Sequence, residues 1–144
     1  MPTQYLLDAS ALLAVLKNER AAPDVEPLLK ISYIHVFNLA EVMTKLIQIG
    51  SEDLLPALRQ LDLKIVSAMS YDETEACARL HAGTRAQGLS LGDCVCLATA
   101  AARGWIAVTK ESLWVKAAEN RGIEVMVVPL KPEKLQFLRS FLSE

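Results

Sequence analysis

The chain has 144 residues, of which 52% are apolar and 22% charged, and it contains 6 Gly and 6 Pro. That length suits one domain with a substantial core, and this composition excludes disordered, collagen-like and low-complexity chains. The 15 Lys and Arg residues against 17 Asp and Glu give a net charge of -2. This balance excludes a broad basic surface for nucleic acid, but not a locally basic or metal-bridged site.

No segment has the pattern of a targeting leader or a membrane span. The N-terminus lacks a basic stretch, and Asp8 interrupts its apolar run. The longest apolar stretches, 94–102 and 125–130, are much shorter than the about 20 residues that cross a bilayer. The 3 cysteines lack the number and spacing of a disulfide framework or a zinc site, and buried thiols explain them better. We therefore expect a reduced, cytoplasmic protein.

Short apolar runs alternate with segments of helical period along the whole chain. In chain order we expect a strand at 5–7, helices at 10–16 and 24–30, a strand at 31–36, helices at 38–49 and 51–61, a strand at 63–66, helices at 71–86 and 90–103, a strand at 105–108, a helix at 112–120, a strand at 124–128 and a helix at 132–142. Apolar strands separated by helices indicate an α/β fold with a parallel sheet covered on both faces. We expect residues 1–144 to form a single domain, with 131–144 as a C-terminal helical extension.

Four acidic residues fall at or soon after the ends of the expected strands. Asp8 ends the first strand, Glu41 lies one turn into the helix after the second strand, and Glu111 follows the fourth strand. Asp93 lies one turn into the helix that starts at Ser90. The carboxyl ends of parallel strands are where α/β proteins gather their functional groups, at the point where the strand order reverses. These four acids are therefore candidate site residues.

Each acid also has a purely structural interpretation. Residues 38–41 and 90–93 both have the pattern of a capping box, in which the acid accepts a hydrogen bond from the cap amide. Asp8 and Glu111 suit the positive N-terminal ends of helices. Capping and a role in a site are compatible, because a helix N-terminus supports negative charge.

The surroundings of Asp8 and Asp93 favour a shared site. Their sequence neighbours are strongly apolar, and no Lys or Arg adjoins Asp8. Acids in apolar surroundings are costly unless they are neutralised, and like charges at one edge repel each other. A divalent cation removes both costs, and carboxylates without a His or Cys cluster suit Mg²⁺ or Mn²⁺ rather than Zn²⁺. Because such ions activate water and stabilise a leaving alkoxide, the pattern points to phosphodiester hydrolysis.

Three segments carry a resemblance to a known family. They read LDASALLA at 7–14, NLAEV at 38–42 and TRAQGLSLGD at 84–93. In this order, over about residues 5–128, they resemble the PIN-domain nucleases, and most of all the VapC-type toxin ribonucleases of bacterial toxin–antitoxin pairs. The combination of the three is specific, although each segment alone is weak.

The resemblance implies a three-layer α/β/α sandwich with a five-stranded parallel sheet, and an endoribonuclease that depends on Mg²⁺ or Mn²⁺. It implies that Asp8 and Asp93 bind the metal, and that Glu41 binds it directly or through water. Ser10 would orient Asp8, and Thr109 matches the threonine after the fourth strand. Members of this family act on RNA as homodimers, and a small VapB-type antitoxin silences them by placing its tail in the acidic cleft.

The fourth motif departs from the family pattern, which has Thr, any residue, Asp, and an aromatic residue three positions later. Here Thr109, Lys110 and Glu111 are followed by Trp114. Glu111 keeps the charge and adds a methylene, so we expect it to tune the site or to bind a second ion. We expect the cation of Lys110 at the cleft, where it either binds phosphate or displaces that second ion.

Two other functions stay open at this point. The first is a catalytically weakened PIN-fold module that binds RNA or a partner, although such a groove does not need carboxylates near phosphate. The second is phosphotransfer through Asp8, which usually requires a second acid two residues later, where this chain has Ser10. Lys45 and Arg85 are either contacts for an RNA backbone or solvated helix cations. Trp114 is interpreted as core packing.

Overall fold

The computed structural model describes residues 3–130 and contains a five-stranded sheet in the order β3-β2-β1-β4-β5. Its strands are β1 (Tyr5–Leu7), β2 (Ser32–His35), β3 (Lys64–Val66), β4 (Ile106–Thr109) and β5 (Val125–Val127). All neighbouring strands are parallel, and Leu7 of β1 is aligned with Ile34 of β2 and Val108 of β4. The predicted α/β class and parallel sheet are confirmed.

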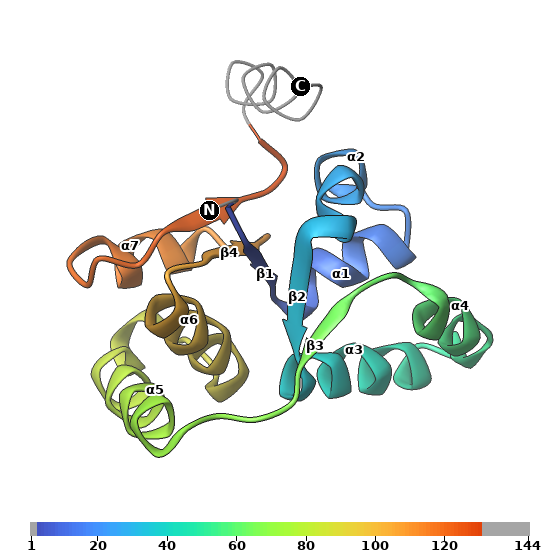
Figure 1. Ribbon diagram of the computed structural model, residues 1–144. Helices are drawn as coiled ribbons and strands as arrows, with labels where there is room; N and C mark the ends of the chain where they lie inside the picture. Colours follow the sequence, from blue (N-terminus) through green and yellow to red (C-terminus); the bar gives the residue numbers. More distant parts are fainter. Residues whose placement is uncertain (1–2, 131–144) are drawn as a thin grey trace.

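Helices cover both faces of the sheet, so the fold has three layers (Figure 1). One side carries α1 (Ala9–Leu16), α2 (Ala22–Val25), α3 (Val36–Gln48) and α4 (Leu55–Gln60), and the other carries α5 (Tyr71–Gly83), α6 (Leu91–Arg103) and α7 (Leu113–Glu119). Three short 3₁₀ helices connect them, η1 (Glu26–Ile31), η2 (Glu52–Leu54) and η3 (Arg85–Gln87). Within residues 3–130 no helix is long and apolar enough to cross a membrane.

The core lies on both sides of the sheet, because side chains of β1 alternate between its faces. Leu6 belongs to the cluster beneath α5, α6 and α7, which includes Trp114 and the buried thiols of all three free cysteines. Tyr5 and Leu7 point to the opposite face and pack with residues of α1 and α2. Trp114 is fully buried, which confirms its interpretation as core packing.

Some element boundaries differ from those expected. Residues 24–30 form the end of α2 and part of the 3₁₀ helix η1, because Pro27 lacks the amide that would continue the hydrogen bonding of α2. The helix expected at 71–86 ends at Gly83 and is followed by η3, and Gly88 then turns the chain with a φ of 76°. The expected helix at 132–142, with the extension 131–144, lies outside the described residues.

The strand order reverses at β1, which creates the crevice that the site occupies. The chain passes from β1 through β2 to β3 on one side, and then crosses to β4 and β5 on the other. The Asp8 amide donates to the carbonyl of Val108 at 3.0 Å, so the carboxyl ends of β1 and β4 are joined. Loops that leave in opposite directions at such a point leave a binding crevice.

Candidate functional site

Asp8 lies at the centre of the crevice, as the N-cap residue of α1. The residue is 3% exposed, and its side chain accepts a hydrogen bond from the amide of Ala11 at 2.8 Å. The hydroxyl of Ser10 donates to both carboxylate oxygens, at 2.8 and 2.9 Å, and that of Thr109 donates to Oδ2 at 2.6 Å. All these donors are neutral groups, so they orient the carboxylate, and no ion pair within residues 3–130 neutralises its charge.

The electrostatic state of Asp8 follows from this burial. Desolvation raises the pKa of Asp8 to about 7, although the hydrogen bonds from Thr109, Ala11 and Ser10 lower it. The nearby charge of Asp93 raises the pKa of Asp8 further. A buried carboxylate in this position is stabilised strongly by any cation that enters the crevice.

Glu41 enters the crevice from α3 and is held by a neighbour on the same helix. Asn38 Nδ2 donates to Glu41 Oε1 at 2.8 Å and to the carbonyl of Gly92 at 3.0 Å. Burial and the charge of Asp93 raise the pKa of Glu41. Gly92 makes room for this carboxylate, because a Cβ at that position would lie 2.6 Å from Glu41 Cδ.

Asp93 reaches the crevice from the first turn of α6, where it completes a capping box with Ser90. The Asp93 amide donates to Ser90 Oγ at 3.1 Å, and the Ser90 amide donates to Asp93 Oδ2 at 2.9 Å. The capping box predicted at 90–93 is therefore confirmed. It occupies one oxygen of a carboxylate that also faces the other acids.

The predicted acids share one cavity of about 250 Å³ at the switch point. It is lined by Asp8, Ala9, Ser10, Leu13, Asn38, Glu41, Lys45, Asp93 and Glu111. Thr109 lies behind this lining, where its Oγ1 donates to Asp8 and accepts from the Glu111 amide at 3.0 Å. A larger cavity of about 500 Å³ beside α5 and α6 is lined mainly by apolar side chains and holds no carboxylate. The candidate site is therefore the smaller, acidic cavity, which we call the acidic pocket.

Lys110 does not occupy the position expected for it. Its ammonium forms an ion pair with Glu19, and it does not line the acidic pocket. The backbone amide of Lys110 donates to Ser10 Oγ at 2.9 Å, so this residue supports the site through its main chain. Lys45 does line the pocket, whereas Arg85 lies in η3 and does not.

The capping box expected at 38–41 is wrong. The helix α3 begins earlier than expected, at Val36, and its N-cap is His35, whose Nδ1 accepts a hydrogen bond from the Phe37 amide at 3.0 Å. Asn38 is consequently free to orient Glu41 inside the helix. Neither this role of Asn38 nor the role of Gly92 was predicted from the sequence. The i, i+3 spacing of Asn38 and Glu41 could have indicated the first, and the small residue beside Asp93 could have indicated the second.

A hard divalent ion fits the donor set of the acidic pocket. The lining supplies four carboxylates and also Oδ1 of Asn38, a buried atom without a hydrogen-bond partner in the described chain. It contains no His or Cys, which softer metals prefer. Across residues 3–130, no three acidic, His or Cys side chains converge closely enough to form a ready-made metal site. Binding of an ion would therefore draw the carboxylates closer together, while the Ser90 amide holds one oxygen of Asp93.

Comparisons with known proteins agree with this fold. A search of curated proteins found no match. Among solved structures, a toxin–antitoxin complex from Klebsiella pneumoniae is 21% identical, with 86% of this chain and 97% of that chain covered and a TM-score of 0.66. A protein from Pyrobaculum aerophilum is 21% identical, with 99% and 98% covered and a TM-score of 0.60. DNA-bound VapBC from Salmonella typhimurium is 15% identical, with 88% and 98% covered and a TM-score of 0.67.

The similarities to solved structures show the fold of this chain, and a match to a protein-family model shows the family to which it belongs. Residues 5–120, which include Asp8, Glu41, Asp93 and Glu111, match the family described as PIN domain. The matched region contains β1 to β4 and the whole lining of the acidic pocket. The chain belongs to the PIN domain family.

Proposed function

We propose that this protein is an endoribonuclease that depends on Mg²⁺ or Mn²⁺. PIN domains are generally nucleases that use divalent metals. The observation that carries the proposal is Asp8, a buried carboxylate that has no ion-pair partner within residues 3–130 and faces three further acids across one pocket. Asp8, Glu41, Asp93 and Glu111 would hold the ion, which would supply the Lewis acid that activates water for attack on a phosphodiester.

The surrounding residues have distinct positioning roles in this proposal. The hydroxyls of Ser10 and Thr109 fix both oxygens of Asp8, so that this carboxylate faces the pocket in one orientation. Asn38 does the same for Glu41. Lys45, the cation in the pocket lining, is available to bind a phosphate oxygen of the RNA.

A metal-dependent cleavage assay tests the proposal. Purified protein is incubated with mixed tRNA, rRNA and mRNA while Mg²⁺ or Mn²⁺ is titrated, and Asp8→Asn is assayed beside it. We expect cleavage by the wild type that needs the ion, and none by the variant. Equal cleavage by both proteins, or none by metal-loaded wild type, would refute it.

We further propose that the protein is a VapC-type toxin, a homodimer in the cytoplasm that a small VapB-type antitoxin inhibits. Two similar structures are described as toxin–antitoxin or VapBC complexes. Expression of the chain in a bacterium should then arrest growth, and Asp8→Asn should remove the arrest. Arrest that persists with the variant would contradict a nuclease toxin.

One observation favours a second candidate, a PIN-fold module that binds RNA or a partner without cutting. Asp93 is bound to its helix cap, and no three acids in the described region are gathered for an ion. The module predicts that RNA binds equally with and without divalent ions and is never cleaved. The cleavage assay therefore separates the two candidates.

A further inference from the structure

Beside the acidic pocket lies a group of cations that the proposed metal site does not use. Lys17 and Lys110 both form ion pairs with Glu19, and the Lys17 pair has an N–O distance of 3.1 Å. Arg20 follows in sequence and has no ion-pair partner in the described part of the chain. Two cations share one carboxylate and a third follows it in sequence, so this segment carries a positive excess. We call Lys17, Arg20 and Lys110 the basic rim.

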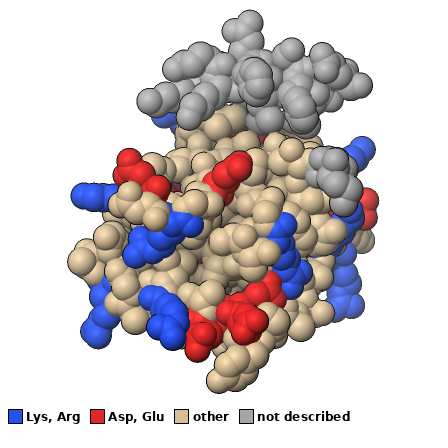
Figure 2. Space-filling view, turned by 60° about the vertical axis from the view of Figure 1, so that its left-hand side comes forward, with Lys and Arg blue, Asp and Glu red and all other residues tan. Residues whose placement is uncertain are grey.

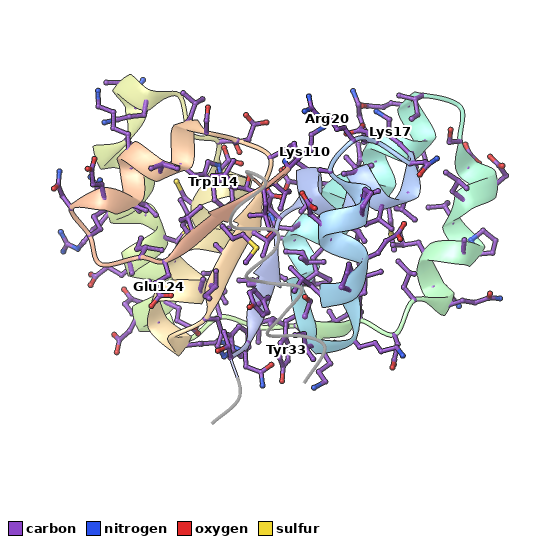
Figure 3. The ribbon with its side chains drawn as sticks, turned by 90° about the horizontal axis from the view of Figure 1, so that it is seen from above. Lys17, Arg20, Tyr33, Lys110, Trp114 and Glu124 are labelled. Carbon is purple, nitrogen blue, oxygen red and sulfur yellow. The ribbon has the colours of Figure 1, made fainter. Side chains whose placement is uncertain are left out.

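The basic rim is attached to the catalytic end of the sheet. Lys110 directly follows Thr109, the last residue of β4, and its amide donates to Ser10 Oγ at 2.9 Å. Ser10 lines the acidic pocket, so the main chain of Lys110 contacts the pocket wall while its ammonium turns to Glu19. In Figure 3 the labelled side chains of Lys17, Arg20 and Lys110 lie together at one end of the molecule, far from Tyr33.

The local backbone holds the rim in place. Asn18 adopts a positive φ of 52°, which turns the chain sharply after α1. The Glu19 amide then donates to the carbonyl of Ala14 at 2.8 Å, which closes the end of the helix. Glu19 is thereby presented to Lys17 and Lys110, whose ammonium groups lower the pKa of its carboxyl. Two exposed lysines are thus fixed by a shared partner instead of moving freely in solvent.

Charge explains why such a rim is needed beside this pocket. A polyanion that approaches four carboxylates is repelled, and the chain as a whole has a net charge of -2. On the face seen in Figure 2, Lys and Arg are mixed with Asp and Glu, so that face provides no broad basic surface. A local positive excess next to the pocket is therefore the feature that can draw a phosphate backbone to it.

We infer that the basic rim binds backbone phosphates of the RNA, next to the scissile bond. This inference rests on the proposed nuclease function and adds a substrate-binding surface to it. The contacts are ionic and independent of sequence, because ammonium and guanidinium groups at this position meet phosphate oxygens and not base edges. Glu19 is the positioning residue of the rim.

Binding of a fluorescent single-stranded RNA, measured by anisotropy in EDTA at several salt concentrations, tests the inference. The rim variant is Lys17→Gln, Arg20→Gln and Lys110→Gln. The control is Lys30→Gln, Arg59→Gln and Lys64→Gln, which changes the net charge equally but near the amino ends of β2 and β3. We expect the rim variant to bind at least about tenfold more weakly at low salt, with a salt slope smaller by about 0.7 for each phosphate that a rim cation no longer neutralises.

The outcomes separate this inference from the proposed function. Equal RNA affinity of the rim and control variants would overturn the rim, even if metal-dependent cleavage is observed. Loss of RNA affinity in the rim variant alone would support the rim, even if no cleavage is found with the wild type. Melting temperature should fall only slightly in both variants, because each loses only exposed contacts, those of Glu19 in the rim variant and that of Lys64 with Tyr33 in the control. Mn²⁺ affinity should not fall in either variant. Weaker binding of an acidic peptide with unchanged RNA affinity would assign the rim to a protein partner and overturn the inference.

Discussion

Gly92→Ala is the sharpest probe of the pocket, because its methyl group acts on one carboxylate. The new Cβ would lie 2.6 Å from Glu41 Cδ, so Glu41 must leave its place and lose the hydrogen bond from Asn38. A hydrogen bond to a charged group contributes about 1.5 kcal/mol, and Gly→Ala in a helix restores up to about 1 kcal/mol. Unfolding free energy should therefore change by less than about 1 kcal/mol, while a change in the residues that position a metal ligand weakens Mn²⁺ binding by about 10- to 100-fold.

Calorimetric titration with Mn²⁺ and thermal melting by circular dichroism measure these two effects separately. Gly83→Ala is the matched control, because its Cβ would meet only Arg121 at an ordinary 3.5 Å. It should leave Mn²⁺ affinity unchanged. In a Glu41→Ala background, Gly92→Ala should have no further effect on Mn²⁺ affinity. Wild-type Mn²⁺ affinity of Gly92→Ala in the native background would refute the assignment of Glu41 as a ligand.

Three further predictions concern single carboxylates. Asp8→Asn should raise the metal-free unfolding free energy by about 4 kcal/mol at pH 8 and by about 1.5 kcal/mol at pH 5. Burial raises the pKa of Asp8 to about 7, so the cost of the buried acid grows as the pH rises from about 4, where the unfolded chain ionises, to about 7; equal urea midpoints for both proteins at pH 8 would contradict this. Glu111→Asp should raise Mn²⁺ affinity or cleavage rate if the added methylene displaces this acid, and unchanged kinetics would show that it takes no part. Glu73→Gln should lower the unfolding free energy by about 0.5 kcal/mol at pH 7, because the hydrogen bond from Arg103 lowers the pKa of Glu73. This difference between the two proteins should disappear as the pH falls through that lowered pKa. A difference that persists at pH 2 would exclude the ion pair as its cause.

Local sequence patterns carried enough information to predict the sheet and most of the pocket. Apolar runs between helical segments fixed the strand positions, and parallel strands bring their carboxyl ends to one edge whatever their order. Asp8 and Glu111 therefore had to lie at the same edge, once β1 and β4 were recognised as strands. Asp93 was predictable for a local reason as well, because Ser90 three residues earlier starts its helix.

Features that depend on distant partners were not predictable in this way. Lys110 pairs with Glu19, which is 91 residues away in sequence, and nothing next to Lys110 indicates that it turns out of the pocket. The start of α3 was misplaced because His35 is an uncommon helix cap, in which an imidazole nitrogen replaces the usual side-chain oxygen. Asn38 has a strong capping preference and was assigned that role in its place.

The two hydrogen bonds between Ser90 and Asp93 have a consequence for ion affinity. If Asp93 turns to a cation, the Ser90 amide loses its acceptor and half of the capping box opens, at a cost of about 1 kcal/mol for one hydrogen bond. Ion binding then competes with the complete capping box of α6 for the carboxylate of Asp93. Ser90, which does not contact the ion, therefore contributes to the ion affinity of the pocket. Amide hydrogen exchange at residue 90 would report that competition, with faster exchange when the ion is bound.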